Sequence, residues 1–97
     1  MRIYVAVDAE LLQRLAAGER ISAPAFRAET EDEEDEAAAL EEAAEHGRIV
    51  VAADVEGDDD VTLDDVASLH VDLDGTGDLA WFATQEIDAV LRIVQEH

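Results

Sequence analysis

The residues of this chain whose types and spacing could bind a metal ion are acidic. A series of oxygen-bearing residues has the ligand spacing of a calcium-binding loop: Asp54, Glu56, Asp58, Asp60, Thr62 and Asp65. Two features oppose a built site. Asp59 stands where the sharp turn of such a loop calls for Gly, and the apolar run before Asp54 enters where a helix is required. The pattern therefore predicts weak, nonspecific binding of divalent cations.

A second arrangement of acids follows from the predicted strands. Asp8, Asp54 and Asp74 come directly after apolar runs. In an open parallel sheet, ligands bind beyond the carboxyl ends of the strands, where three carboxylates could hold Mg²⁺. Asp8 also has a sufficient role as the N-cap of the next helix, and no Gly-rich phosphate loop accompanies the acids. The complete set of candidate metal ligands is Asp8, Asp54, Asp58, Asp65 and Asp74.

The stretch 72–76, Asp-Leu-Asp-Gly-Thr, resembles the aspartyl-phosphate loop of haloacid-dehalogenase-type phosphatases. Those enzymes also need a Lys, and this chain has none. The His residues lack metal-ligand spacing, and Ser22 and Ser68 lie in no nucleophile motif. The sequence therefore predicts no catalytic residue and no cofactor, and it favours a protein that is not an enzyme.

An aromatic side chain gives the best candidate for binding. The apolar stripe of residues 79–94 has helical spacing, and on that helix Trp81 lies on the polar side. A large aromatic residue outside the apolar stripe either is covered by another segment or anchors a partner. The candidate interface comprises Trp81, Thr84, Gln85 and Asp88.

Charge limits the classes of partner. The chain holds 26 acidic residues against 6 basic ones, all Arg, for a formal net charge of −20. Nucleic acid and anionic membranes would meet like charge on such a surface, so the composition excludes both as direct partners. The chain has no Cys, which excludes disulfides and thiolate chemistry. No apolar run is long enough to span a membrane and no signal peptide is recognisable, which predicts a soluble, cytoplasmic protein.

Hydrophobic periodicity predicts the elements that must position these residues. The 97 residues suffice for a single domain, 1–97. Strands are expected at 2–7, 25–28, 49–53 and 67–74, and helices at 9–17, 30–46 and 79–94. A single helical turn, capped by Thr62, precedes the last strand. The order strand, helix, strand, helix, strand, strand, helix predicts an α/β domain with a small four-stranded, largely parallel sheet flanked by helices. The alternative is a ferredoxin-like α+β sandwich.

Segments covering much of the chain resemble an uncharacterised protein family of actinobacteria. They are 1–5 (MRIYV), 48–55 (RIVVAADV), 65–72 (DVASLHVD) and 79–87 (LAWFATQEI). The resemblance implies no activity. It implies that Trp81, Thr84 and Gln85 belong to a family motif.

Together these observations favour a non-enzymatic, strongly acidic intracellular domain that acts through contacts with a partner protein or with a second copy of itself. The alternative is a nucleic-acid mimic, whose carboxylates replace phosphates on a basic nucleic-acid-binding protein. A small divalent-metal-dependent enzyme or a calcium-binding module is the third hypothesis.

Overall fold

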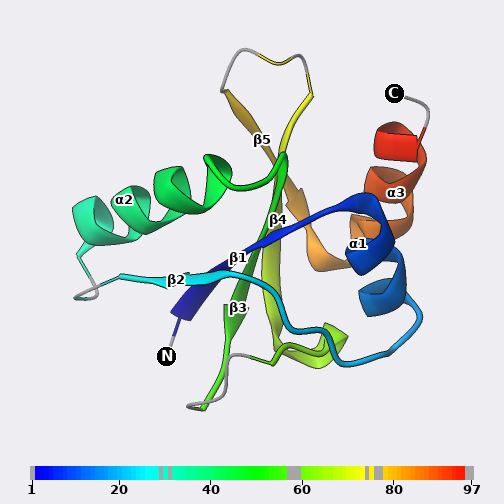
Figure 1. Cartoon of the computed structure of the whole chain (residues 1–97), viewed down its shortest axis with the longest axis horizontal. Coiled ribbons are helices and arrows are strands. Elements are labelled where there is room, and N and C mark those ends of the chain that lie inside the picture. Colours follow the sequence, from blue (N-terminus) through cyan, green and yellow to red (C-terminus); the bar gives the residue numbers. More distant parts are fainter. Residues whose placement is uncertain are drawn as a thin grey trace.

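A computed structural model describes residues 2–28, 30, 32–56, 60–73, 75 and 78–95. Its five strands form one sheet in the order β2-β1-β3-β4-β5, and every neighbouring pair is antiparallel (Figure 1). The strands are β1 (Arg2–Val7), β2 (Ala25–Arg27), β3 (Ile49–Asp54), β4 (Val66–Asp72) and β5 (Leu79–Ala83). The helices are α1 (Ala9–Ala16), α2 (Glu33–Ala44) and α3 (Ile87–Gln95), with 3₁₀ turns η1 (Leu63–Asp65) and η2 (Thr84–Glu86).

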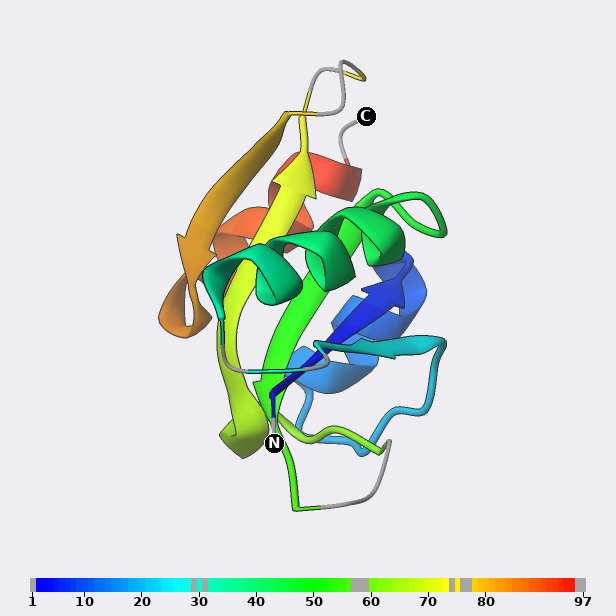
Figure 2. The ribbon, with the colours of Figure 1, turned by 90° about the vertical axis from the view of Figure 1, so that its left-hand side faces the viewer.

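The predicted four-stranded, largely parallel α/β sheet is wrong, because the sheet is antiparallel and the fold is α+β. A helix between two strands predicts a parallel crossover, but here the segment after α1 turns back along the sheet. Ile21 pairs with Val61, and the Pro24 carbonyl then accepts from the Ala6 N–H at 3.0 Å, so β2 runs against β1. The ferredoxin-like alternative also does not describe the chain. It places its helices on one face, whereas Figure 2 shows α2 in front of the sheet and α1 and α3 behind it.

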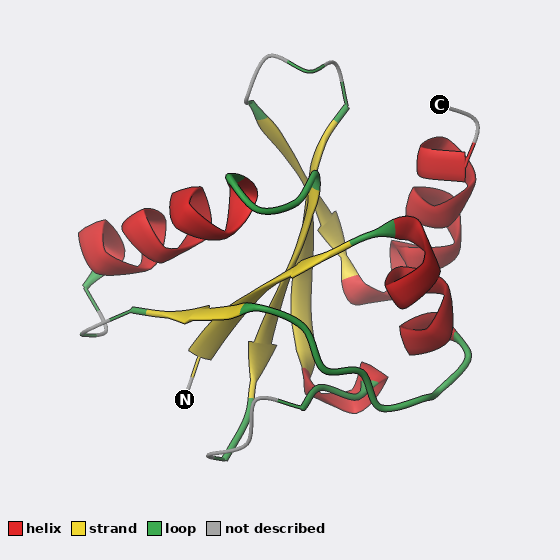
Figure 3. Cartoon of the chain, viewed as in Figure 1, coloured by secondary structure: helices red, strands yellow, loops and turns green. Residues whose placement is uncertain are grey.

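The predicted helix over 79–94 is wrong in its first part. Residues Leu79–Ala83 form strand β5, and α3 begins only at Ile87 (Figure 3). The apolar residues of this segment fit the periodicity of a helix and that of a strand, since Phe82 can reach the core from either. The segment is a strand because it pairs with β4 over five residues, from Asp72↔Leu79 to Ser68↔Ala83.

Two clusters of buried side chains hold the layers together. The larger lies between the sheet and helices α1 and α3, and its fully buried members include Leu12, Leu15, Leu69 and Val90. The smaller lies beneath α2, where Ala39 and Ala43 pack on Tyr4, Val50 and Ala52. Small side chains on α2 let its backbone approach β1 and β3 closely. Among the described residues, this smaller cluster takes none from β4 or β5, so the apolar core beneath α2 does not extend to that half of the sheet face.

Candidate functional site

The β4–β5 half of this sheet face, which we call the open face, includes Ser68, His70, Leu79 and Trp81 and runs from buried Ser68 to exposed Trp81. Side chains alternate between the two faces of a strand, so Trp81 points away from the core that Phe82 enters. Trp81 lies directly opposite His70, and His70 in turn pairs with Val50, which packs beneath α2, so both side chains belong to the face of the sheet on which α2 lies. Trp81 keeps 61% of its surface exposed, more than any other large hydrophobic side chain that the structure describes. The open face is therefore an aromatic surface with polar groups beside it.

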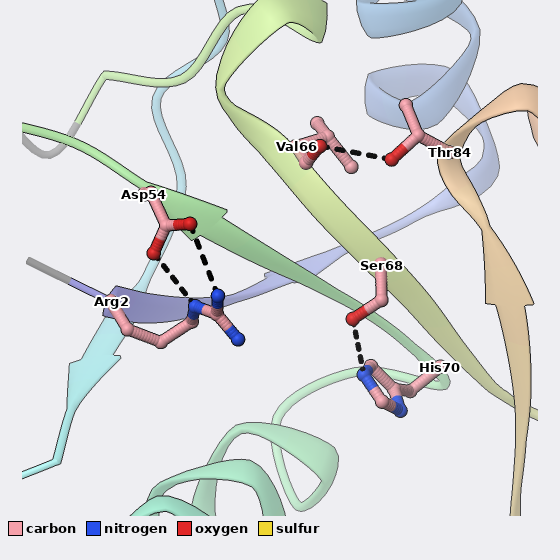
Figure 4. A network of polar contacts seen from close by, with 6 residues as sticks. All are labelled: Arg2, Asp54, Val66, Ser68, His70 and Thr84. Atoms are coloured by element: carbon pink, nitrogen blue, oxygen red, sulfur yellow. Dashed lines mark hydrogen bonds and ion pairs between the residues drawn. The ribbon is translucent and has the colours of Figure 1, made fainter. Parts of the chain in front are cut away.

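A hydrogen bond joins the two polar residues of the open face. Ser68 Oγ and His70 Nε2 lie 2.9 Å apart, and the Ser68 side chain is buried (Figure 4). Burial, and secondarily the positive charge of Arg2, lower the pKa of His70 below its ordinary value. A neutral histidine can therefore accept the Ser68 proton, which is the first half of a nucleophile and base pair. In the described part of the chain, no group hydrogen-bonds the other ring nitrogen to orient it. The described residues thus supply two members of such an arrangement and not the third group of a triad.

Arg2 and Asp54 form an ion pair at the end of the β1–β3 ladder, where the two residues are register partners. The guanidinium donates from Nε to Oδ1 at 2.8 Å and from a terminal nitrogen to Oδ2 at 3.1 Å. Hydrogen bonding to Arg2 lowers the pKa of the Asp54 carboxyl and raises that of the guanidinium. Both side chains are substantially exposed, so the pair contributes little stability. It does engage both carboxylate oxygens of a predicted metal ligand.

The antiparallel sheet separates two of the predicted metal ligands, Asp8 and Asp54. Asp8 follows Val7, the register partner of Ile49, whereas Asp54 pairs with Arg2 at the other end of the same ladder. The expectation that strand ends would bring Asp8 and Asp54 together is therefore wrong, because it depended on parallel strands. Asp8 caps α1, accepting from the Leu11 N–H at 2.8 Å.

Asp65 is occupied in the same way, since its carboxylate accepts from the Thr62 N–H at 3.1 Å and so caps the predicted helical turn before β4. The structure brings it to one open hollow whose lining also includes Arg20, Asp54 and Asp60. Asp58 and Asp74 lie outside the described residues. Across the described ranges, no three acids or histidines are placed to hold a metal ion.

The predicted interface residues do not form one patch. Thr84 is structural, because its hydroxyl donates to the Val66 carbonyl at 2.9 Å and fastens η2 to the start of β4 (Figure 4). Gln85 and Asp88 are exposed, but Asp88 belongs to α3, which packs on the opposite face of the sheet. Only Trp81 lies on the open face. Ser68 and His70 both fall within the strand predicted at 67–74, but their mutual hydrogen bond was not predicted.

The His70 environment predicts a dependence of stability on pH. The pKa of His70 is lower in the folded chain than in the unfolded chain, where it is about 6.5. At a pH just below 6.5, His70 therefore binds a proton in the unfolded chain but not in the folded chain. The free energy of unfolding should therefore fall as the pH falls from about 6.5 toward the folded pKa. Urea unfolding midpoints across this window measure it. His70→Gln should reduce the slope, while His46→Gln, which leaves the Ser68–His70 pair intact, should keep it. An unchanged slope in His70→Gln would contradict the assignment.

Comparison with known proteins found no match to this chain among protein-family models, curated proteins or solved structures. The resemblance to an actinobacterial family therefore stays a prediction. No helix in the described part of the chain has the length and apolar character needed to cross a membrane. The cytoplasmic location is likewise still a prediction.

Proposed function

We propose that this chain is a non-enzymatic protein-binding domain whose binding surface is the open face, with Trp81 as the anchor. The observation that carries the proposal is the 61% exposure of the Trp81 side chain on a strand. An indole buries a large area when a partner covers it, and tryptophan is among the commonest hot-spot residues of interfaces. The fold itself does not use this side chain, because β5 contacts the core through Phe82.

The groups beside Trp81 suit a protein partner. His70 lies opposite Trp81 on the neighbouring strand, its lowered pKa favours the neutral form, and it is hydrogen-bonded to Ser68. A partner can therefore cover these residues without burying an unpaired charge. Asp72, which lies on the same face of β4 as His70, would contribute to the polar rim that interfaces commonly have. Aromatic centre and charged rim together are the arrangement expected of a specific contact surface.

Truncation of Trp81 tests this proposal. Trp81→Ala should weaken partner binding or self-association by about 2 kcal/mol or more, which is roughly a thirtyfold change in Kd. Leu73→Ala is the matched control, since Leu73 is also an exposed large hydrophobic side chain but lies beyond the end of β4. Quantitative affinity capture and light scattering measure the two kinds of contact. Equal retention of partners and of oligomeric state in both variants would refute the proposal.

The nucleic-acid mimic is a second candidate, supported by the surface of α2. The first turn of this helix carries Glu33, Glu34, Asp35 and Glu36, and its last turn has no basic residue to balance Glu41 and Glu42. Such a row of carboxylates can stand in for phosphates. Partners captured through α2 would be released by added DNA, and the Trp81→Ala variant would still capture them. Partners captured through the open face should show the opposite behaviour.

A further inference from the structure

We infer that β5 receives an extended basic segment of a partner protein as a sixth strand of the sheet. The inference rests on the proposed function and names the partner of the same surface. Its starting point is that β5 is an edge strand, since the sheet order ends with it.

Backbone hydrogen bonds at both ends of β5 show which groups face outward. The Ala83 N–H donates to the Glu86 carboxylate at 3.0 Å, so it does not point toward β4. At the other end, Asp72, the register partner of Leu79, donates its N–H to the Arg48 carbonyl at 3.1 Å, away from β5. In an antiparallel pair, hydrogen-bonded and non-hydrogen-bonded positions alternate. The backbone groups of Leu79 and Trp81 therefore face the free edge.

The two edges of the sheet differ in their protection. At the far edge, β2 is only three residues long, contains Arg27 and follows Pro24 closely. Short length, charge and proline are the usual means of blocking strand addition. The edge at β5 has five residues, none charged and none proline. It is the edge that can accept another strand.

Charge decides which strand fits. Asp78 and Glu86 flank the two ends of β5, and the chain as a whole carries a formal net charge of −20. Antiparallel pairing with a second copy would bring the acidic end of one β5 toward the acidic end of the other. A segment rich in Arg or Lys instead meets opposite charge at both ends. The exposed indole of Trp81 offers the same segment a cation–π contact.

Alternation fixes the pattern of the segment. Side chains on the Trp81 side would be Arg or Lys, next to the indole and the acidic rim. Side chains on the opposite side would be apolar, because they continue the surface of Ala80 and Phe82 toward α3. The expected ligand is thus an extended stretch of alternating basic and apolar residues.

A capped synthetic peptide of alternating arginine and valine is the probe, and a peptide of the same composition with its arginines in one block is the control. At about 0.15 M NaCl, where long-range attraction is screened, the alternating peptide should bind at least tenfold more tightly. Binding is measured by the fluorescence anisotropy of a dye on the peptide, because the variants that replace Trp81 remove the only tryptophan in the chain. Hydrogen exchange should show new protection at the amides of Leu79 and Trp81. Trp81→Lys, which puts a cation on the edge, should abolish the preference, whereas Leu73→Ala should keep it.

Equal binding of both peptides, or binding without protection at those two amides, would overturn the added strand. If Trp81→Ala still loses natural partners in that case, the proposed function stands and only this inference fails. Self-association that depends on Trp81 and strengthens with salt would also overturn it, because the occupant would then be a second copy.

Discussion

Leu69→Ala is expected to lower the free energy of unfolding by about 3 kcal/mol, within the usual range of about 2–5 kcal/mol for a buried leucine. Leu69 is fully buried on β4, between Val51 and Phe82 of the neighbouring strands, in the cluster that joins the sheet to α1 and α3. Truncation removes apolar contacts from three elements at once and leaves a cavity that a β-sheet cannot easily close. Chemical denaturation monitored by circular dichroism measures the loss.

Trp81→Ala is the matched control for this experiment. Although the indole is larger than the leucine side chain, it lies on the open face, so its removal should change the free energy of unfolding by less than about 1 kcal/mol. A loss in Trp81→Ala equal to that in Leu69→Ala would mean that Trp81 is a core residue. The strand register of β5 and the proposed anchor would then both be wrong.

Raising NaCl from about 0.05 to about 1 M should increase the melting temperature, because the Debye length falls to about 3 Å and the self-repulsion of the chain is screened. A gain of about 1 kcal/mol corresponds to roughly 4–8 °C for a domain of this size. The repulsion arises from the formal net charge of −20. A melting temperature that stays flat or falls over this range would remove repulsion as a determinant of stability.

The end of α2 gives this prediction a matched variant. Glu41, Glu42 and Glu45 lie at the helix C-terminus, where the dipole disfavours negative charge and where no basic residue balances them. Replacing all three with Gln should raise the melting temperature at low salt and make its dependence on NaCl shallower. The same replacement of Glu33, Glu34 and Glu36 should help less, because these residues lie at the favourable end of the dipole.

Much of the local structure was predictable from the sequence, because local structure depends on neighbours along the chain. Apolar or alternating runs of residues form β1, β3 and β4. The observed bounds of these strands lie within two residues of the predicted ones. The Asp8 cap of α1 and the helical turn before β4 are also confirmed. Each depends on hydrogen bonds or side-chain periodicity within a few residues, which the sequence displays directly.

Strand direction and the open face were decided only by the tertiary structure. Whether β2 runs with or against β1 depends on the path of residues 17–24, which follows from contacts such as Ile21 with Val61 rather than from local preference. The stretch Leu79–Ala83 fits a helix or a strand equally well until β4 lies beside it and supplies partners for its backbone. That pairing puts Trp81 across from His70, exposes it, and leaves β5 as an open edge. Periodicity along one segment records which side chains seek the core, but only the neighbouring segment determines which backbone groups remain free.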